Sequence, residues 1–130
     1  VIAQLPEKLA AQQKAFHETG GLHASALFDL DGNLLAVRED VGRHNALDKV
    51  IGHAFFEDKL PLNKTILLVS GRVSFEIMQK AIAAGIPCIA AISAPTSLAI
   101  KLAQSSERTL IGFLRGSCMN IYSGEEHIAE

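Results

Sequence analysis

The sequence predicts one α/β domain, in which a mixed sheet lies between helices on both faces to give three layers. Two patterns support this prediction. A hairpin signal near the start is followed by short apolar runs that alternate with amphipathic helical segments. A hairpin followed by strand–helix–strand units combines antiparallel and parallel strands in one sheet. We therefore expect residues 1–130 to form a single domain in the order α-β-β-α-β-α-β-α-β, with room for one further strand.

The first segments predict a helix and then a hairpin. Apolar residues recur at helical spacing over residues 5–16, and Pro6 suits a first helical turn. Residues 24–29 and 34–37 are apolar stretches on either side of Asp29-Leu30-Asp31-Gly32-Asn33. The Asp-Gly pair tolerates the positive φ that a tight hairpin turn needs, so the two stretches are expected to pair.

The rest of the chain predicts alternating helices and buried strands. Helices are expected where apolar residues follow the helical period, and strands where apolar residues run together. Phe75, Met78 and Ile82 share one face of a predicted helix, and we expect Leu98 and Leu102 to face inward on the next. The predicted helices are residues 44–56, 75–82 and 96–104, and the predicted strands are residues 66–69, 86–92, 110–114 and 119–122.

Composition limits the classes of function. The 130 residues carry 12 Lys and Arg against 14 Asp and Glu, a formal charge of −2. This balance provides no cationic field for duplex nucleic acid, so no nucleic-acid partner is expected. No apolar run approaches the roughly 20 residues of a membrane span, and residues 1–4 do not begin a signal peptide. We therefore expect a cytoplasmic protein that is not attached to a membrane.

The two cysteines, Cys88 and Cys118, make neither a Cys-x-x-Cys pair nor a four-ligand zinc set. Cys88 lies in an apolar run and is predicted to be a buried, reduced thiol. Cys118 is the better candidate for exposure, but no neighbouring feature marks it as a nucleophile. Zinc-dependent deamination needs His-x-Glu and Pro-Cys-x-x-Cys motifs. Here Ala46 and Ala91 stand where the glutamate and the second cysteine would be, so no zinc or other metal site is expected.

Ligands of open α/β sheets bind beyond the carboxyl ends of the parallel strands. Three loops at predicted strand ends, residues 39–45, 70–74 and 93–97, combine helix starts with glycine or hydroxyl residues, and two of them carry arginine. Such residues also serve as ordinary helix caps. Three of these loops at one sheet edge nevertheless favour a phosphate or nucleotide site, because free N–H groups and arginine both bind anions. The candidate residues are Arg43, His44, Ser70, Gly71, Arg72, Ser93 and Thr96.

The sequence leaves alternative roles open for two histidines and for the turn at residues 115–118. His44, at a helix start, suits hydrogen bonding to a base or a phosphate. His23 begins the first predicted strand, where a place at the same edge and an ordinary surface or core position are both open. Residues 115–118 could form a functional loop or a plain hairpin turn.

Several blocks of the sequence resemble the FdhD family, the formate dehydrogenase accessory sulfurtransferases. Residues 38–49, Arg-Glu-Asp-Val-Gly-Arg-His-Asn-Ala-Leu-Asp-Lys, are the most specific of these blocks. Residues 19–28, 70–76, 93–97 and 120–122 match the family as well. The resemblance covers nearly the whole chain from about residue 15.

The resemblance implies a cytidine-deaminase-like α/β fold and a cytoplasmic protein that receives persulfide sulfur from a cysteine desulfurase. Family members pass this sulfur to the molybdenum bis(molybdopterin guanine dinucleotide) cofactor, which formate dehydrogenase needs. The Cys-x-x-Cys loop that carries sulfur in the family lies before the matched region, and this sequence does not contain it. We therefore expect the C-terminal, cofactor-binding domain of such a protein, which by itself does not transfer sulfur.

The family also associates one further segment with cofactor binding. It matches Phe113, Leu114, Arg115, Gly116, Ser117 and Cys118 here. A basic residue often stands in the family where this chain has Cys118, so the contact at that position is open. The alternative to cofactor binding is a partner-docking or dimerisation module with no ligand of its own, and a homodimer is possible. Binding of a guanine nucleotide would distinguish the two.

Overall fold

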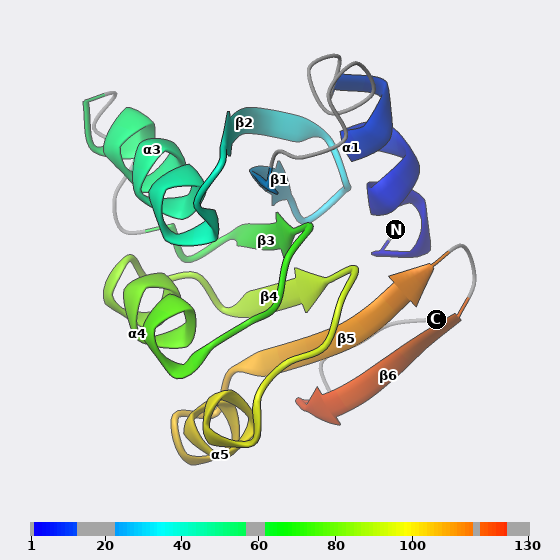
Figure 1. The fold of residues 1–130 in the computed structure, drawn as a ribbon, viewed down its shortest axis with the longest axis vertical. Coiled ribbons are helices and arrows are strands. Elements are labelled where there is room, and N and C mark those ends of the chain that lie inside the picture. The colour runs from blue at the N-terminus through cyan, green and yellow to red at the C-terminus, as the bar shows by residue number, and fades with distance from the viewer. Residues whose placement is uncertain (1, 13–22, 57–61, 116–117, 125–130) are drawn as a thin grey trace.

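The computed structural model describes residues 2–12, 23–56, 62–115 and 118–124. They form a six-stranded mixed sheet with helices on both faces (Figure 1), which confirms the predicted class. The strand order is β2-β1-β3-β4-β5-β6. The elements are η1 (Ile2–Gln4), α1 (Leu5–Gln12), β1 (His23–Asp29), β2 (Leu34–Asp40), α3 (Arg43–Phe56), β3 (Thr65–Val69), α4 (Phe75–Ala83), β4 (Cys88–Ala91), α5 (Ser97–Ser105), β5 (Thr109–Arg115) and β6 (Cys118–Ser123).

The predicted hairpin is confirmed, and its turn is held by one carboxylate. Oδ1 of Asp29 accepts hydrogen bonds from the backbone N–H groups of Asp31 and Asn33, each at 2.9 Å. The bonds from Asn33, together with the weaker effects of Asp31 and Gly32, lower the pKa of the Asp29 carboxyl. Gly32 has a φ of +87°, which a residue with a side chain rarely adopts. β1 then pairs antiparallel with both β2 and β3, so the hairpin joins the rest of the sheet.

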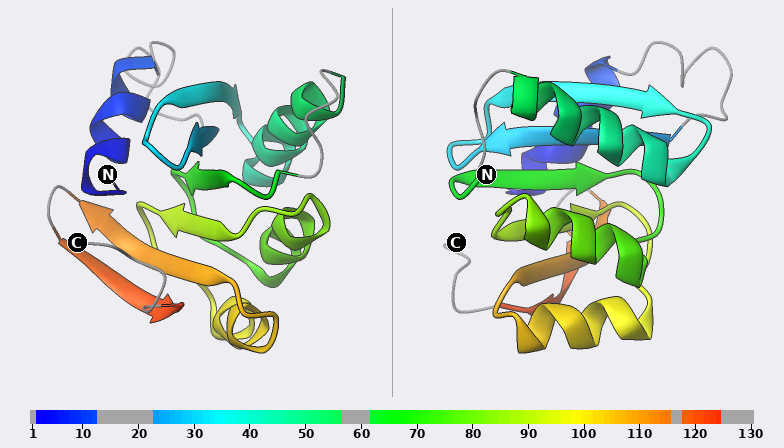
Figure 2. Two further views of the ribbon diagram at one scale, coloured as in Figure 1. Left: turned by 180° about the vertical axis from the view of Figure 1, so that it is seen from behind. Right: turned by 90° about the vertical axis from the view of Figure 1, so that its left-hand side faces the viewer.

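The centre of the sheet is parallel and covered on both faces. β3, β4 and β5 run parallel, and β3 is buried along its whole length. Figure 2 shows α3, α4 and α5 on one face and α1 on the other. One core cluster includes Leu47 of α3 and Ile77 of α4, and the other joins Leu5 and Leu9 of α1 to Phe28 of β1. A continuous apolar run such as that of β3 is expected where a strand is buried on both sides.

The predicted inward faces of two helices are confirmed in part, because Met78 is fully buried and Ile82 and Leu102 pack against the core. The inward placement of Leu98 is wrong, because its side chain is 59% exposed, and Phe75 is 37% exposed. The buried side of α5 is made by Ala99 and Ala103, and Leu98 lies off that side. The residues that face inward are Ala99 and Ala103 on α5, and Ile77, Met78 and Ala81 on α4.

Some predicted boundaries change or cannot be compared. The strand expected over residues 86–92 is shorter, because β4 spans Cys88–Ala91. The predicted first helix begins as expected, but its part beyond residue 12 lies outside the described residues. Within the described ranges, none of the helices has the length and apolar content needed to cross a membrane.

Candidate anion-binding site at the carboxyl edge of the sheet

Four strands end at one edge of the sheet, which we call the carboxyl edge. β3, β4 and β5 are parallel. β2 runs in the same direction, because it is antiparallel to β1 and β1 is antiparallel to β3. The loops that follow β2, β3 and β4 lie at this edge, beside the start of β1 (Figure 2). The three predicted loops, residues 39–45, 70–74 and 93–97, therefore come to one edge of the sheet.

The start of β1 contacts the loop after β3. The Ser70 hydroxyl oxygen accepts a hydrogen bond from the backbone N–H of Ala24 at 2.8 Å, and the Ser70 N–H donates to the Ala24 carbonyl at 3.0 Å. At the next residue, a Cβ on Gly71 would lie 2.9 Å from Nδ1 of His23 and 3.6 Å from Cβ of Arg43. Gly71 is thus the point at which the side chains of His23 and Arg43 approach the loop.

Two arginines lie at this edge without a carboxylate partner among the described residues. Arg43 is the first residue of α3, and its Nε is buried with no hydrogen-bond partner in that part of the chain. Arg72 is exposed in the loop after β3. No ion pair within the described ranges includes either side chain. Their guanidinium groups therefore retain hydrogen-bonding capacity for an anion.

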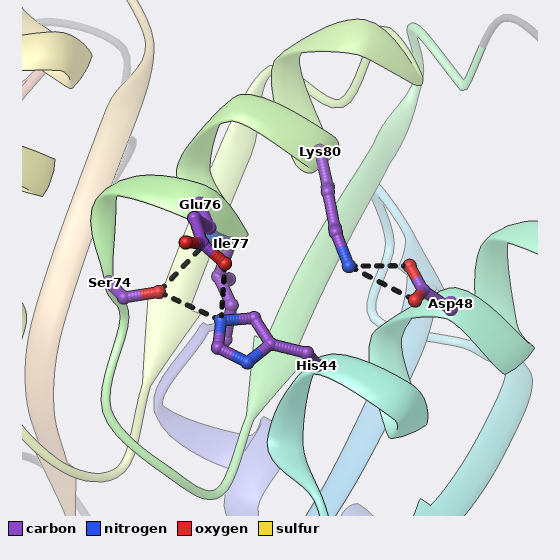
Figure 3. A network of polar contacts seen from close by, with 6 residues as sticks. All are labelled: His44, Asp48, Ser74, Glu76, Ile77 and Lys80. Carbon is purple, nitrogen blue, oxygen red and sulfur yellow. Dashed lines mark hydrogen bonds and ion pairs between the residues drawn. The ribbon is translucent and has the colours of Figure 1, made fainter.

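His44 joins α3 to α4 through one ring nitrogen (Figure 3). Its Nε2 lies 3.2 Å from Oγ of Ser74, which caps α4, and 3.6 Å from Oε2 of Glu76. A second bridge between the helices runs from Lys80 Nζ to the carboxylate of Asp48, at 3.0 Å from each oxygen. Because Nε2 already faces α4, Nδ1 is the ring nitrogen through which His44 could contact a ligand.

The negative charge of Asp40, at the end of β2, is balanced by neighbouring groups. Its Oδ2 lies 2.7 Å from Nζ of Lys49, and its Oδ1 accepts the backbone N–H of Gly42 at 3.0 Å. The hydrogen bond from Lys49, followed by that from Gly42, lowers the pKa of the Asp40 carboxyl to about 2. The carboxylate is therefore ionised but paired, so Lys49 offsets its repulsion of an anion at the edge.

The loop after β4 is tied to the neighbouring loops by backbone hydrogen bonds. The N–H of Val73 donates to the Ala94 carbonyl at 3.2 Å, and the N–H of Thr96 donates to the Val73 carbonyl at 2.9 Å. The Ser93 carbonyl accepts the N–H of Phe113 at 3.1 Å. Thr96 also caps α5 with its side chain, a role worth about 1 kcal/mol without any ligand. Its hydroxyl proton is still available to donate.

β5 leaves regular geometry at Phe113. This residue has a φ of +51°, its side chain is 42% exposed, and the register with β6 is broken between Gly112 and Arg115. A Cβ at Gly112 would lie 2.7 Å from Cδ of Pro95 and 2.9 Å from Cε2 of Tyr122, so the loop after β4 packs directly on β5. Backbone strain of about 1–3 kcal/mol clusters at ligand sites in general, and here it lies in the segment that the family resemblance associates with cofactor binding.

The remaining residues of that segment differ in accessibility. Leu114 is fully buried in the core, so only its backbone could reach a ligand. Arg115 is the last residue of β5 and pairs in register with the exposed Cys118, the first residue of β6. Gly116 and Ser117 lie outside the described residues.

The cysteines and the possible metal ligands do not form a second candidate site within the described ranges. Cys88 is a free, half-buried cysteine, and burial raises the pKa of its thiol to about 12, so the thiol stays protonated. Cys118 is exposed, as predicted. Across those ranges, no group of three or more His, Cys, Asp or Glu residues is placed to hold a metal ion.

Sequence reasoning missed or left open several residues of this edge. It did not settle where His23 lies, and it missed Glu76 beside His44 and Lys49 beside Asp40. The position of His23 follows from topology, because a strand antiparallel to β3 begins where β3 ends. The two charged contacts join side chains 9 and 32 residues apart in the chain, and no local spacing signals them.

These features define a mixed α/β domain in which cationic, glycine-containing loops gather at one edge of the sheet. Comparison with known proteins identifies the family. Residues 1–129 match the model of the FdhD/NarQ family. The chain belongs to this family.

Its relatives include proteins named sulfur carrier protein FdhD. The one from Streptomyces avermitilis is 59% identical over 129 residues, which cover 99% of this chain and 46% of that protein. The one from Saccharolobus solfataricus is 56% identical over 128 residues, which cover 98% and 50% of the two proteins. The chain thus spans about half the length of the curated relatives it matches.

A solved structure shares the fold. The crystal structure, described as that of a formate dehydrogenase accessory protein from Desulfotalea psychrophila, superimposes with a TM-score of 0.91 at 30% sequence identity. The match covers 98% of this chain and 54% of that one. The six-stranded mixed sheet is therefore an architecture of this family, whereas the cytidine-deaminase-like relationship stays an expectation.

Proposed function

We propose that this chain binds the guanine dinucleotide end of the molybdenum bis(molybdopterin guanine dinucleotide) cofactor at the carboxyl edge, and that it does so as part of a cytoplasmic sulfur carrier. The observation that carries the proposal is the guanidinium group of Arg43. Its Nε is buried without a hydrogen-bond partner among the described residues, at a sheet edge where three helices begin. A buried cationic donor left unpaired is unfavourable, and a phosphate would satisfy it.

The rest of the edge suits the same ligand. Arg72 provides a second guanidinium, and the first turns of α3, α4 and α5 add partial positive charge. The hydroxyl groups of Ser70 and Thr96 accept backbone hydrogen bonds and keep a proton to donate. A guanine dinucleotide offers phosphate oxygens to these donors and a base to the exposed ring of Phe113.

In the whole protein, this binding would serve sulfur transfer. A cysteine desulfurase would supply sulfur as a persulfide, and the cofactor would receive it before use by formate dehydrogenase. The cysteines of this chain do not suit the carrier role, because the high pKa of Cys88 keeps its thiol protonated and Cys118 is not part of a Cys-x-x-Cys pair. We therefore assign cofactor binding to this chain and expect no sulfur transfer by it alone.

A second function is favoured by one observation. Four exposed large apolar side chains lie at or beside the carboxyl edge: Val41 (76% exposed), Leu98 (59%), Phe113 (42%) and Phe75 (37%). Exposed apolar side chains at one edge favour protein docking, so we infer that the same edge would also meet the dehydrogenase that takes the cofactor. Replacing Val41 and Leu98 together with serine should weaken co-purification with formate dehydrogenase and leave guanine nucleotide affinity unchanged.

Calorimetric titration with GDP tests the main proposal. GDP should bind saturably, and Arg43→Ala and Arg72→Ala should each weaken binding by about ten-fold or more, because hydrogen bonds to charged groups contribute about 1.5–3 kcal/mol. Lys64→Ala is the control, since Lys64 is exposed just before β3, at the opposite edge of the sheet. A folded chain that does not bind GDP would refute the assignment of cofactor binding to this domain.

A further inference from the structure

We propose that His23 is a further phosphate-binding residue of the carboxyl edge, where its ring donates a hydrogen bond to the same phosphate group as Arg43. This inference rests on the proposed function and deepens it, because it states which part of the nucleotide meets the start of β1. The sequence alone left the role of His23 open.

The fold holds the His23 ring in a defined place. His23 is the first residue of β1 and is partly buried, and its ring occupies the space that a side chain at residue 71 would need. A Cβ there would lie 2.9 Å from Nδ1 and 3.4 Å from Cε1 of the ring. Gly71 is not among the residues with positive φ, so the backbone does not itself require glycine. Glycine is required at this position because the imidazole lies against it.

In the described part of the chain, His23 makes no polar contact at either ring nitrogen. Of the three histidines there, His44 directs Nε2 at Ser74, and Nδ1 of His53 lies 2.9 Å from Nη2 of Arg38. No hydrogen bond or ion pair within the described ranges reaches the His23 ring. A partly exposed imidazole that is held in place but unpaired is available to a ligand.

The side chains of Arg43 and Ser70 near His23 can donate hydrogen bonds, which favours a phosphate over the N–H-bearing edge of a base. Arg43 has five N–H donors and no acceptor, and its Cβ lies beside Gly71. The Ser70 oxygen accepts the N–H of Ala24 and retains its hydroxyl proton. Three donors thus come from the start of β1, the loop after β3 and the start of α3. Phosphate oxygens accept several such bonds at once, whereas the Watson–Crick edge of guanine carries N–H donors and needs acceptors from the protein as well.

The acidic side chain that is paired with His23 does not oppose this role. His23 is paired in register with Asp40 across β1 and β2, so the two side chains lie on the same face of the hairpin. The Asp40 carboxylate is held by Lys49 at 2.7 Å and by the N–H of Gly42 at 3.0 Å. A phosphate at His23 and Arg43 would therefore meet a neutralised carboxylate.

The test is titration of the wild-type chain and of His23→Ala with GDP, and with inorganic pyrophosphate as a competitor. The substitution should weaken GDP and pyrophosphate by the same factor, about ten-fold, as expected for one lost hydrogen bond to a charged group. Gly71→Ala, which displaces the ring and keeps the histidine, should weaken both ligands as well. Gly52→Ala is its control, because no atom lies within 4 Å of a Cβ at residue 52.

The outcomes separate this inference from the function on which it rests. If the wild-type chain binds GDP and His23→Ala binds it equally well, only the role of His23 is overturned. If His23→Ala weakens GDP but not pyrophosphate, His23 contacts the base and the phosphate assignment is wrong. If the wild-type chain binds neither ligand, both the proposed function and this inference fail. Should His23→Ala unfold, His23→Gln and Gly71→Ala decide the question by the same comparison.

Discussion

Replacing Gly112 with alanine tests how the loop after β4 is seated on β5. The added Cβ would lie 2.7 Å from Cδ of Pro95 and 2.9 Å from Cε2 of Tyr122, about 0.7 and 0.5 Å short of the 3.4 Å at which ordinary contact begins. Both neighbours are rings, and the carbonyl before Pro95 and the N–H after it are tied to Val73. The Pro95 ring is part of the backbone, so it cannot move without disturbing these hydrogen bonds. Overpacking of this kind costs about 1–3 kcal/mol.

Urea unfolding of Gly112→Ala, with Gly52→Ala as the matched control, measures this effect. Gly112→Ala should lower the free energy of unfolding by about 1–3 kcal/mol and lower Tm by about 4 °C for each kcal/mol. Gly52 lies inside α3 with open space around it. The same exchange there should raise stability by about 1 kcal/mol, because alanine is the better helix former. If Gly112→Ala is as stable as the wild type, Pro95 and Tyr122 do not pack over Gly112.

Three further predictions concern ionisation, reactivity and strain. The pKa of Asp40 is lowered to about 2 from its ordinary 3.8, mainly by Lys49. Its contribution to stability is therefore complete above about pH 4 and is lost as the pH falls towards 2. The urea midpoint of the wild type should fall more across that interval than that of Asp40→Asn, and equal slopes would contradict the pairing with Lys49. Because the pKa of Cys88 is about 12, its thiol should resist thiol reagents at pH 8 until the chain unfolds, whereas the exposed Cys118 should react at once. Cys118→Ser leaves Cys88 as the thiol to be measured, and rapid labelling of this folded variant would contradict the prediction. In urea unfolding, Phe113→Gly should be more stable than Phe113→Ala by about 1 kcal/mol. Both variants lack the ring, but only glycine tolerates a φ of +51° without strain. Equal stabilities of the two variants would contradict the positive φ.

The element order was predictable because its signals are local. The Asp-Gly turn between β1 and β2 and the apolar run of β3 each identify an element within a few residues of sequence. The inward faces of α4 and α5 were less predictable, since hydrophobic spacing favours the larger side chain. On α5 the small side chains of Ala99 and Ala103 are buried and the larger Leu98 is exposed, an arrangement that hydrophobic spacing does not indicate.

The candidate site, too, was predictable only in part. The rule that ligands bind at the carboxyl ends of parallel strands identified the loops that carry Arg43 and Arg72, because it needs only the order of elements. The contacts of His23 with Gly71, and of Glu76 with His44, depend on strand register and on the packing of α3 against α4. These arrangements are set by the whole fold, so no spacing in the sequence could indicate them.

The central claim is that a guanine nucleotide binds at the carboxyl edge, and mapping GDP by two-dimensional ¹H–¹⁵N NMR of the labelled chain tests it most directly. Saturating GDP should shift the amide signals of Arg43, Gly71, Ser93 and Phe113, which lie at this edge. The amides of the β1–β2 turn, such as Leu30 at the opposite edge, should keep their positions. Shifts confined to that turn, or no shifts in a folded chain, would contradict the account.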